Sequence, residues 1–570
     1  MRYTKTEKGL TVNIITGTHV VFFGLDLSAP KRKGFRGFGF QSFDSVEGDT
    51  VWLRGIKTFE SVEPHPALGE TFSSRVHPVQ SFQWADYSAK PGREYAYTVV
   101  ALYGQPAALE SRIEIKVNVR TEPEAGKSHC VYFNRGSVAT QEYARRFQDK
   151  KPSAAGPGAY EWLSRGLLEA LVAFIGQAKR GWSIHGAIYE FQWNAALEAV
   201  KAAKTRGADV NIIFDEIKAR DSTGKPTGPW QKNREAVEKF NLGDVCTGRV
   251  NGKLMHNKFF VLSRNNKLVS VWTGSTNLTE NGIFGHSNLG HVVKDAAVAK
   301  AYLDYWNRLK TDPAIDAAYR GDNVASLSTP PVKWTDETVS VFSPRGTNLD
   351  ALNWYATLAA EAKNALLMTF AFGMHPLFQS VYSKNDDVLR MGLLETTTRS
   401  PKTAAQDAID MKAIRRRPNV VVAIGNRIVT NSFDRWLKEL TQIHDKQVHV
   451  HWIHTKYMLL DPLGAKPVVV TGSANFSKAS TDTNDENMLV IQGNKRIADI
   501  YFGEFLRLYN HYAFREAVKR ALDSKKVGKA RDWKPQFLDT EDSWMKQYFD
   551  AADTSARYAR RKYFAGPMSL

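Results

Sequence analysis

Apolar and polar residues alternate along the first 120 residues, as they do in half-buried β-strands. Residues 93–104, "REYAYTVVALYG", carry apolar side chains at every second position, and residues 112–120, "RIEIKVNVR", alternate strictly between apolar and polar residues. Turns such as "AKPG", residues 89–92, separate these runs. Several short strands of this kind predict a small β-sandwich over residues 1–120.

The pattern then changes to alternating helices and strands. Residues 160–179 carry apolar side chains at helical spacing, and residues 182–191 have the composition of a buried strand. An amphipathic helix is predicted over residues 194–207, ending at Gly207, with the next strand over residues 208–216. A strand, helix and strand in such close succession predict a βαβ unit and a parallel or mixed sheet.

The second half of the chain repeats this order. A helix followed by a strand is predicted over residues 352–372, a buried strand over 419–425 and a helix over 431–443. The chain ends in a basic tail, which we expect to be helical and docked on the surface. The predicted parts are a sandwich over 1–120, two α/β halves over 121–325 and 326–515, and the tail over 516–570.

The composition and the net charge of the chain limit the classes of partner that we expect. The chain has 570 residues, which is long enough for several domains, and its net charge of +18 favours nucleic acid, an anionic membrane surface or a phosphorylated substrate. A basic soluble protein without such a partner is the alternative. The only cysteines, Cys130 and Cys246, give no disulfide framework. Without a secretory segment at the start or an apolar run of membrane-spanning length, we expect a cytoplasmic protein.

One sequence frame occurs twice, 198 residues apart. Residues 254–277 read "LMHNKFFVLSRNNKLVSVWTGSTN", and residues 452–475 read "WIHTKYMLLDPLGAKPVVVTGSAN". Both contain His-x-Lys and then Gly-Ser-x-Asn at constant spacing. The aligned pairs are His256 and His454, Lys258 and Lys456, Ser263 and Asp461, Ser275 and Ser473, and Asn277 and Asn475. A single His-x-Lys means little, but this set repeated indicates a duplicated domain of about 200 residues.

Displacement at a phosphodiester requires the residue types of this repeated frame. It needs a nucleophile, a proton donor for the leaving oxygen and positive charge around the non-bridging oxygens. Two imidazoles suit the first two roles, because their pKa lies near neutrality. Two lysines and two asparagine amides can hold the phosphoryl oxygens as charge develops. We therefore expect one site, without a metal or another cofactor, at the seam between the two halves.

These motifs resemble those of the phospholipase D superfamily, whose signature is His-x-Lys-x4-Asp followed by Gly-Ser-x-Asn. The second copy, "HTKYMLLD", matches in full, whereas the first, "HNKFFVLS", has Ser263 in place of the aspartate. The resemblance covers residues 121 to 515. It implies a phosphohistidine intermediate, no metal, and two α/β halves related by pseudo-twofold symmetry, which complete one pseudo-dimeric site within the chain. The fold class expected is α/β, with the β-sandwich in front. In that sandwich, residues 82–104 resemble part of a fibronectin type III-like module.

The resemblance also implies a residue that supports each histidine ring. A carboxylate about 32 residues after the motif histidine has this role in many members of the superfamily; the matching residues here are Glu486 in the second copy and Asn288 in the first. In two-domain members the support often crosses to the histidine of the opposite half. Glu486 would then orient His256, which makes His256 the expected nucleophile and His454 the expected general acid, although either imidazole can play either part.

Further histidines lie close in sequence to the two copies of the motif. Residues 449–454, "HVHWIH", suggest zinc, but His449 and His451 would share one strand face and His454 the other, and no acidic or cysteine ligand is close in sequence. We expect no metal site. His286 and His291 are expected at the surface or beside the site rather than as ligands.

The motifs leave the substrate open. The net charge and the absence of a secretion signal or lipid anchor favour a nuclease acting on DNA or RNA. The first alternative is a phospholipase D or transphosphatidylase that acts on phospholipid at an anionic membrane surface. The second is a catalytically weak nucleic-acid-binding protein. This hypothesis depends on Ser263, which stands in place of the aspartate of the motif. The N-terminal β module is expected to dock a partner or a second stretch of substrate.

Overall fold

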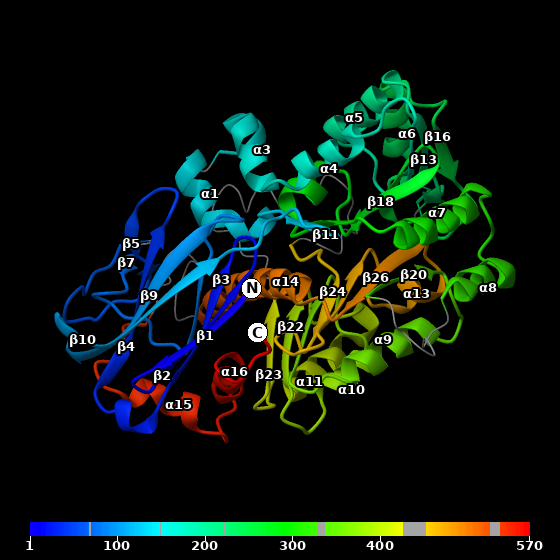
Figure 1. Ribbon diagram of the computed structural model, residues 1–570. Coiled ribbons are helices and arrows are strands. Elements are labelled where there is room, and N and C mark those ends of the chain that lie inside the picture. The colour runs from blue at the N-terminus through cyan, green and yellow to red at the C-terminus, as the bar shows by residue number, and fades with distance from the viewer. Residues whose placement is uncertain are drawn as a thin grey trace.

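The computed structural model describes residues 1–67, 70–148, 150–220, 223–224, 226–327, 337–425, 452–524 and 536–570. The helix predicted over 431–443 lies outside the described residues, as do His449 and His451. Figure 1 shows an N-terminal β region beside two α/β halves, one above the other. This arrangement confirms the fold class predicted from the sequence.

The N-terminal region consists of two four-stranded sheets. The first has the order β1 (Arg2–Glu7), β2 (Leu10–Thr16), β3 (Val21–Leu27), β8 (Gln83–Asp86). The second has the order β10 (Ala108–Arg120), β9 (Glu94–Gln105), β4 (Phe35–Asp44), β5 (Thr50–Trp52). Ile113 and Ile115 of β10 are buried and alternate with exposed polar residues, as the period of two predicts. The likeness to a fibronectin type III-like module stays a prediction.

Each α/β half is built on a seven-stranded sheet, and the two sheets have the same strand order. The first half has the order β11 (His129–Phe133), β19 (Leu289–Val293), β18 (Lys267–Gly274), β17 (Lys258–Arg264), β12 (Trp182–Ile188), β13 (Asp209–Asp215), β16 (Cys246–Arg249). The second has the order β20 (Thr338–Ser343), β26 (Glu486–Gln492), β25 (Val468–Gly472), β24 (Tyr457–Leu460), β21 (Ala365–Phe370), β22 (Leu389–Leu394), β23 (Val420–Ile424).

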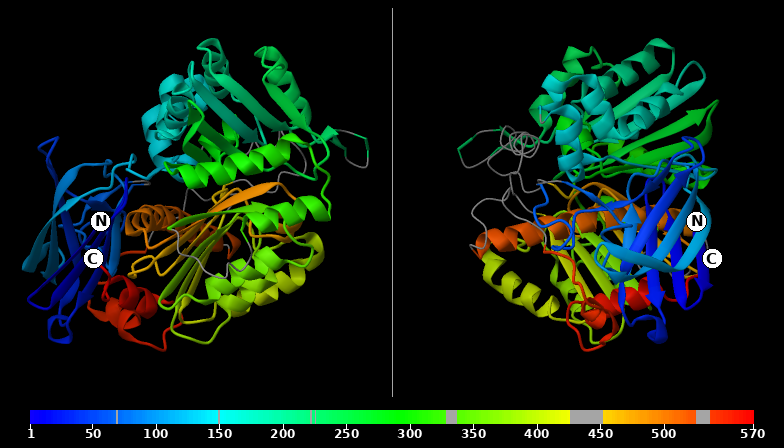
Figure 2. Two further views of the ribbon diagram at one scale, coloured as in Figure 1. Left: turned by 45° about the vertical axis from the view of Figure 1, so that its right-hand side comes forward. Right: turned by 90° about the vertical axis from the view of Figure 1, so that its left-hand side faces the viewer.

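The pairing directions also match. In both sheets the fifth, sixth and seventh strands are parallel, and the remaining neighbours are antiparallel. The parallel strands are those of the predicted βαβ units. The two sheets lie one above the other in Figure 2, and strands β18 and β25 contact each other across the seam. One hydrophobic cluster runs through both halves.

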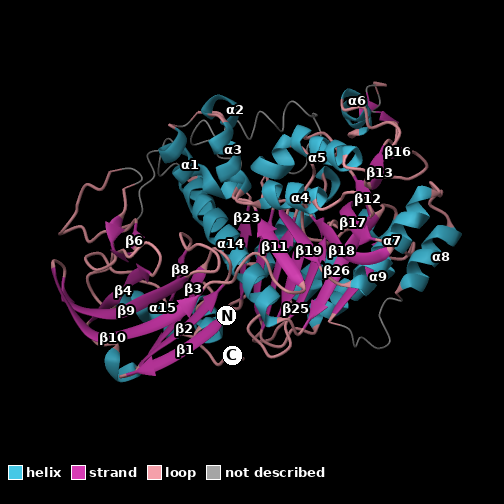
Figure 3. Cartoon of the chain, turned by 45° about the horizontal axis from the view of Figure 1, so that its top comes forward, coloured by secondary structure: helices cyan, strands magenta, loops and turns pink. Residues whose placement is uncertain are grey.

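Helices pack against the sheets (Figure 3), and the two that follow the last strand of the first half also contact β20 of the second half. In the first half they are α1 (Thr140–Phe147), α2 (Pro152–Ala155), α3 (Pro157–Ser164), α4 (Leu167–Gly176), α5 (Asn194–Thr205), α6 (Trp230–Lys239), α7 (Ala296–Lys310) and α8 (Ala317–Ser326). In the second half they are α9 (Asp350–Ala360), α10 (Pro376–Tyr382), α11 (Ala404–Ile414) and α13 (Lys478–Asp482).

The helical run predicted over 160–179 is broken into α3 and α4. Arg165 and Gly166 both have positive φ, of 49° and 85°. Glycine tolerates this conformation, and the buried Arg165 side chain is held by the Phe133 carbonyl and, at 2.7 Å, by Glu504. Tertiary contacts of the arginine therefore override the helical spacing of the apolar residues.

Helix α14 (Lys495–Asp523) joins the three regions, because it contacts β2 of the sandwich, β11 of the first half and β23 of the second. The chain then returns to the sandwich through α15 (Lys546–Phe549) and α16 (Arg557–Phe564). Phe564 is fully buried, with its ring centroid 4.9 Å from that of Phe22. The C-terminal segment thus forms part of the packing of the sandwich.

Candidate active site at the seam between the halves

The two motif histidines lie at the seam, directly before matching strands. His256 precedes β17, and its backbone N–H donates to the Asp485 carbonyl of the other half at 2.9 Å. At the equivalent place in the other copy, Ser287 pairs with Ile453 in an isolated parallel bridge, and its N–H donates to the Trp452 carbonyl at 2.8 Å. Each catalytic segment is therefore bonded to the opposite half.

The imidazole rings are supported across the same seam. His256 Nδ1 lies 2.9 Å from Glu486 Oε2, and His454 Nδ1 lies 2.9 Å from Asn288 Oδ1. All four side chains are buried. The crossed arrangement that the superfamily resemblance implies is present, with a carboxylate on one side and an amide on the other.

The hydrogen-bond network sets the tautomer of His454. Asn288 Nδ2 donates to the Gly282 carbonyl at 2.7 Å, so its Oδ1 faces the ring and accepts from Nδ1–H. Ser275 Oγ donates to the same Oδ1 at 2.8 Å. The Nε2 atom of His454 then has the free lone pair, and the carboxylate of Glu486 favours the same tautomer in His256.

Burial and charge determine the protonation of the rings. Burial lowers the pKa of His256 to about 4, although Glu486 acts to raise it. Burial, with the nearby charge of Lys456, lowers the pKa of His454 well below its usual value. Burial acts to raise the pKa of Glu486, but His256 beside it keeps that pKa below the usual range. At neutral pH the site therefore contains neutral rings beside an ionised carboxylate.

The two motif lysines are buried beside the histidines. Lys258 Nζ donates to the His256 carbonyl at 2.6 Å, and Lys456 Nζ donates to the His454 carbonyl at 2.5 Å. Burial lowers the pKa of Lys258 to about 7 and lowers that of Lys456 well below its usual value. Bringing an anion into the site would reverse these shifts, because the charged lysine would then have a partner.

The motif serines and asparagines complete the pattern. Ser473 Oγ accepts from the Asn487 backbone N–H at 3.0 Å, and so holds the strand that begins with Glu486. Asn277 Oδ1 and Asn475 Oδ1 are buried without a hydrogen-bond partner. Both amides therefore have an acceptor left for a hydroxyl or N–H group of a substrate.

Two positioning carboxylates were missed from the sequence. Asp215 Oδ2 accepts from the Met255 N–H at 2.9 Å, and Glu395 Oε2 accepts from the Ile453 N–H at 2.9 Å. Asp215 is the last residue of β13 and Glu395 directly follows the matching strand β22, and each carboxylate holds the residue before a motif histidine. Burial raises the pKa of Asp215 to about 7. The signal was available in "IIFDE" and "GLLET", where an acid directly follows each apolar run.

Glu190 is a third carboxylate that the motifs did not indicate. It follows β12, hydrogen-bonds to the Asn277 side chain, and lies beside Lys258; burial raises its pKa. The register of the two sheets places Phe372 at the equivalent position of the second half. The two sides of the site therefore differ in charge.

Ser263 and Asp461 lie outside the site, which corrects their assignment as supporting site residues. Seven residues of extended chain separate His256 from Ser263, a span of about 20 Å. Ser263 Oγ lies 2.5 Å from Ser183 Oγ on β12. Asp461 Oδ1 accepts from the Asn364 and Ala365 backbone N–H groups, at 2.6 and 2.9 Å, at the start of β21. Both residues tie the far ends of neighbouring strands together.

The remaining histidines form no metal centre in the part of the chain that the structure describes. His286 is buried rather than at the surface, with its ring centroid 5.3 Å from that of His454. His291 is fully buried, and its Nε2 lies 2.9 Å from His129 Nδ1.

Comparison with known proteins identifies a shared domain. Residues 171–310 and 402–509 match the family model described as the PLD-like domain of cardiolipin synthase. Each half thus contains one segment that is similar to a phospholipase D-like domain, and this similarity supports phosphodiesterase activity. A search of curated proteins found no match.

The chain is also similar to three solved structures. The phosphatidylserine synthase of Haemophilus influenzae is 13% identical, with 64% of this chain and 92% of that chain covered and a TM-score of 0.42. Nuc of Salmonella typhimurium, a phospholipase D family member, is 20% identical, with 32% and 95% covered and a TM-score of 0.22. The polyphosphate kinase of Porphyromonas gingivalis is 12% identical, with 57% and 43% covered and a TM-score of 0.36. The match thus spans less than half of that kinase.

Proposed function

We propose that the protein is a metal-independent phosphodiesterase that cleaves nucleic-acid backbones through a phosphohistidine intermediate. The observation that carries the proposal is the crossed pair of supported histidines, each with a free Nε2 and a neighbouring lysine. Nucleophile, proton donor and phosphate-binding cations are then all side chains of this chain.

The proposed reaction has two steps. His256 Nε2 attacks phosphorus, the P–N bond forms, and the P–O bond to the leaving group breaks as His454 Nε2 gives that oxygen its proton. Water then attacks phosphorus while His454 Nε2 takes a proton from that water, and the P–N bond breaks. The incoming phosphodiester supplies the negative charge that raises the pKa of His454 and allows it to be protonated at the start.

Charge matching supports this assignment of roles. The attacking imidazole gains positive charge when it bonds to phosphorus, and Glu486 can stabilise that charge at 2.9 Å. The general acid instead loses positive charge in the same step, so the neutral amide of Asn288 is a sufficient partner for His454. The carboxylate therefore lies beside the ring whose charge rises.

The net charge of +18 supports nucleic acid as the substrate. Phospholipid at an anionic surface is the second candidate, because the same reaction chemistry and the same charge would serve it. No helix within the described residues is long and apolar enough to cross a bilayer. The N-terminal sandwich would contribute by docking a partner or a second stretch of substrate.

The test is cleavage of labelled single-stranded DNA, duplex DNA and RNA in EDTA, with His256→Ala as the inactive variant and the exposed His65→Ala as the matched control. We expect cleavage by the wild type and by His65→Ala and none by His256→Ala. Cleavage that EDTA abolishes would contradict the mechanism. Phosphatidylcholine vesicles form the second arm: turnover there alone would reassign the substrate to lipid. Salt-sensitive binding of nucleic acid without turnover of any substrate would indicate a binding protein.

A further inference from the structure

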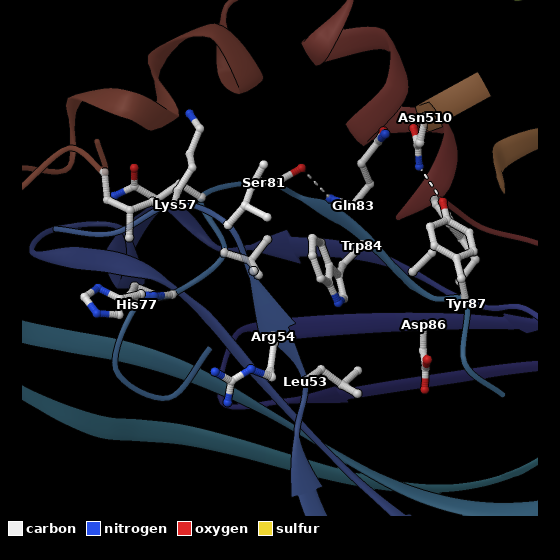
Figure 4. Close-up of a pocket in the computed structure, with 18 of the residues that line it drawn as sticks. Leu53, Arg54, Lys57, His77, Ser81, Gln83, Trp84, Asp86, Tyr87 and Asn510 are labelled. Atoms are coloured by element: carbon white, nitrogen blue, oxygen red, sulfur yellow. Dashed lines mark hydrogen bonds between the residues drawn. The ribbon is translucent and has the colours of Figure 1, made fainter. Parts of the chain in front are cut away.

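A cavity lies at the junction of the sandwich, α14 and the C-terminal segment (Figure 4). Its volume is about 690 Å³, within the range of small-molecule sites. Residues 53–57 and 77–81, strand β8, Asn510 of α14 and Leu538 contribute to its walls. None of the catalytic residues lines it.

The walls are mainly apolar. Leu53, Ile56, Val79 and Leu538 line the cavity together with the indole of Trp84. One face of that indole stacks on Phe40, with ring centroids 6.0 Å apart and planes 24° apart, so the opposite face is the one left for the cavity. Ile56 is 37% exposed, so an apolar side chain at the cavity remains open to solvent. An apolar ligand would cover these surfaces.

The cavity wall is held in place by hydrogen bonds. The Leu538 backbone N–H donates to the Thr58 carbonyl at 2.8 Å. Gln80 makes two bonds to Asp539: its Nε2 donates to the carbonyl at 2.7 Å, and its Oε1 accepts from the N–H at 2.9 Å. The C-terminal wall is thus tied to the sandwich before any ligand binds, which lowers the entropic cost of binding.

The carboxylate and the phenol that line the cavity already have partners. The buried Asp86 carboxylate accepts from Tyr97 OH at 2.8 Å and from the Ser88 N–H and hydroxyl at 2.8 and 2.6 Å. The Tyr87 hydroxyl accepts from Asn510 Nδ2 at 2.6 Å and donates to a carbonyl of α14. These contacts leave little capacity to receive a donor from a ligand.

Lys57, by contrast, has no carboxylate partner. It extends from the sandwich toward the C-terminal segment (Figure 4), and no carboxylate of the described residues forms an ion pair with it. The neighbouring Arg54 guanidinium already donates to the hydroxyl and the carbonyl of Thr71. Burial and the charge of Arg557 lower the pKa of Lys57. His77 Nδ1 accepts from the Phe59 N–H at 3.1 Å, so the neutral ring carries its proton on Nε2.

We propose that this cavity binds an amphiphilic organic anion, whose apolar body packs on Trp84 and whose acidic group pairs with Lys57. An apolar lining explains the body of the ligand. The sign of its charge follows from the ammonium of Lys57, which has no carboxylate partner among the described residues, and from the Asp86 carboxylate, whose hydrogen bonds are already made. The site is separate from the phosphodiesterase centre, so its occupancy is measured without any assumption about the reaction.

Calorimetric titration of the full-length protein with decanoate and with decylammonium tests the proposal, because the two probes share a chain and differ in charge. We expect decanoate to bind at least about tenfold more tightly. Lys57→Gln should remove that preference by weakening decanoate alone. Lys116→Gln, on the exposed face of β10, is the matched control and should bind like the wild type.

A blocking variant locates the binding. Ile56→Trp, at a partly exposed position, should weaken both probes. A bromine-substituted decanoate should quench tryptophan fluorescence in the wild type and less in Trp84→Phe, a readout that does not depend on the blocking variant folding normally. Equal binding of the two probes, tighter binding of decylammonium, or quenching unchanged in Trp84→Phe would overturn the proposal. Tighter binding of a mononucleotide than of decanoate would also overturn it.

Discussion

The two halves share one sheet topology but surround their histidines differently. Glu486 from the second half supports His256, whereas the amide of Asn288 from the first half supports His454. The flank of the site also differs, with Glu190 in one half and Phe372 in the other. Symmetric folding thus produces two rings with unequal electrostatics, and the proposed division of roles between nucleophile and acid rests on this inequality.

The largest expected effect is a difference between the two histidine variants in how their reaction rates depend on the leaving group of the substrate. His256→Ala should lose at least ~10⁴-fold in kcat on every substrate, because no other group forms the P–N bond. His454→Ala should lose roughly 10³-fold on DNA but little on a thymidine p-nitrophenyl phosphodiester, whose leaving group needs no proton. Steady-state rates on both substrates provide the measurement. If the nitrophenyl ester rescued His256→Ala instead, the roles would be reversed.

The variant Glu486→Gln removes the carboxylate that supports the His256 ring. We expect kcat to fall by roughly 10²-fold, because the cation formed on His256 loses its counter-charge. Glu486 acts to raise the pKa of His256, which lies at about 4, so the variant should move the acidic limb of kcat/KM to still lower pH. A pH–rate profile measures both effects. An acidic limb that moved to higher pH would contradict the pairing.

The variant Asn288→Asp places a carboxylate beside each of the two histidine rings. A carboxylate there would favour the protonated ring and raise the pKa of His454, so the basic limb of kcat/KM should move up by about one pH unit. Lys258, whose pKa is about 7, also loses its charge on that side of the profile. Comparison with the wild type therefore isolates the contribution of His454. An unmoved basic limb would show that His454 is not the general acid.

The smallest effect is expected at the aspartate of the superfamily signature. Asp461→Ala and Ser263→Ala should each lower stability by about 1 kcal/mol, because each removes hydrogen bonds that join neighbouring strands. Neither variant should change kcat by more than about twofold, since neither side chain reaches the histidines. Urea denaturation followed by circular dichroism, with rates measured in parallel, tests this. A large loss of kcat in folded Asp461→Ala would place that residue back in the mechanism.

Periodicity and the repeated frame predict much of this molecule. The duplicated halves, the histidines and the lysines are predicted by the sequence, because constant spacing in a repeat reflects constant geometry. The crossed partners Glu486 and Asn288 were expected only from the resemblance to the superfamily. Asp215 and Glu395 are harder to find, since their role is to bind a backbone N–H that is distant in sequence. The break at Arg165 depends on an ion pair with Glu504, which no local pattern reveals.

The backbone hydrogen bonds from His256 to Asp485 and from Ser287 to Trp452 join the two halves beside the histidines. Docking of the halves therefore also assembles the proposed site. Neither half contains a finished catalytic group, because each ring takes its partner from the other half. Separation of the halves by even a few ångströms would remove the hydrogen-bond partner of each ring. In the proposed mechanism the protein is therefore active only while the two halves are docked.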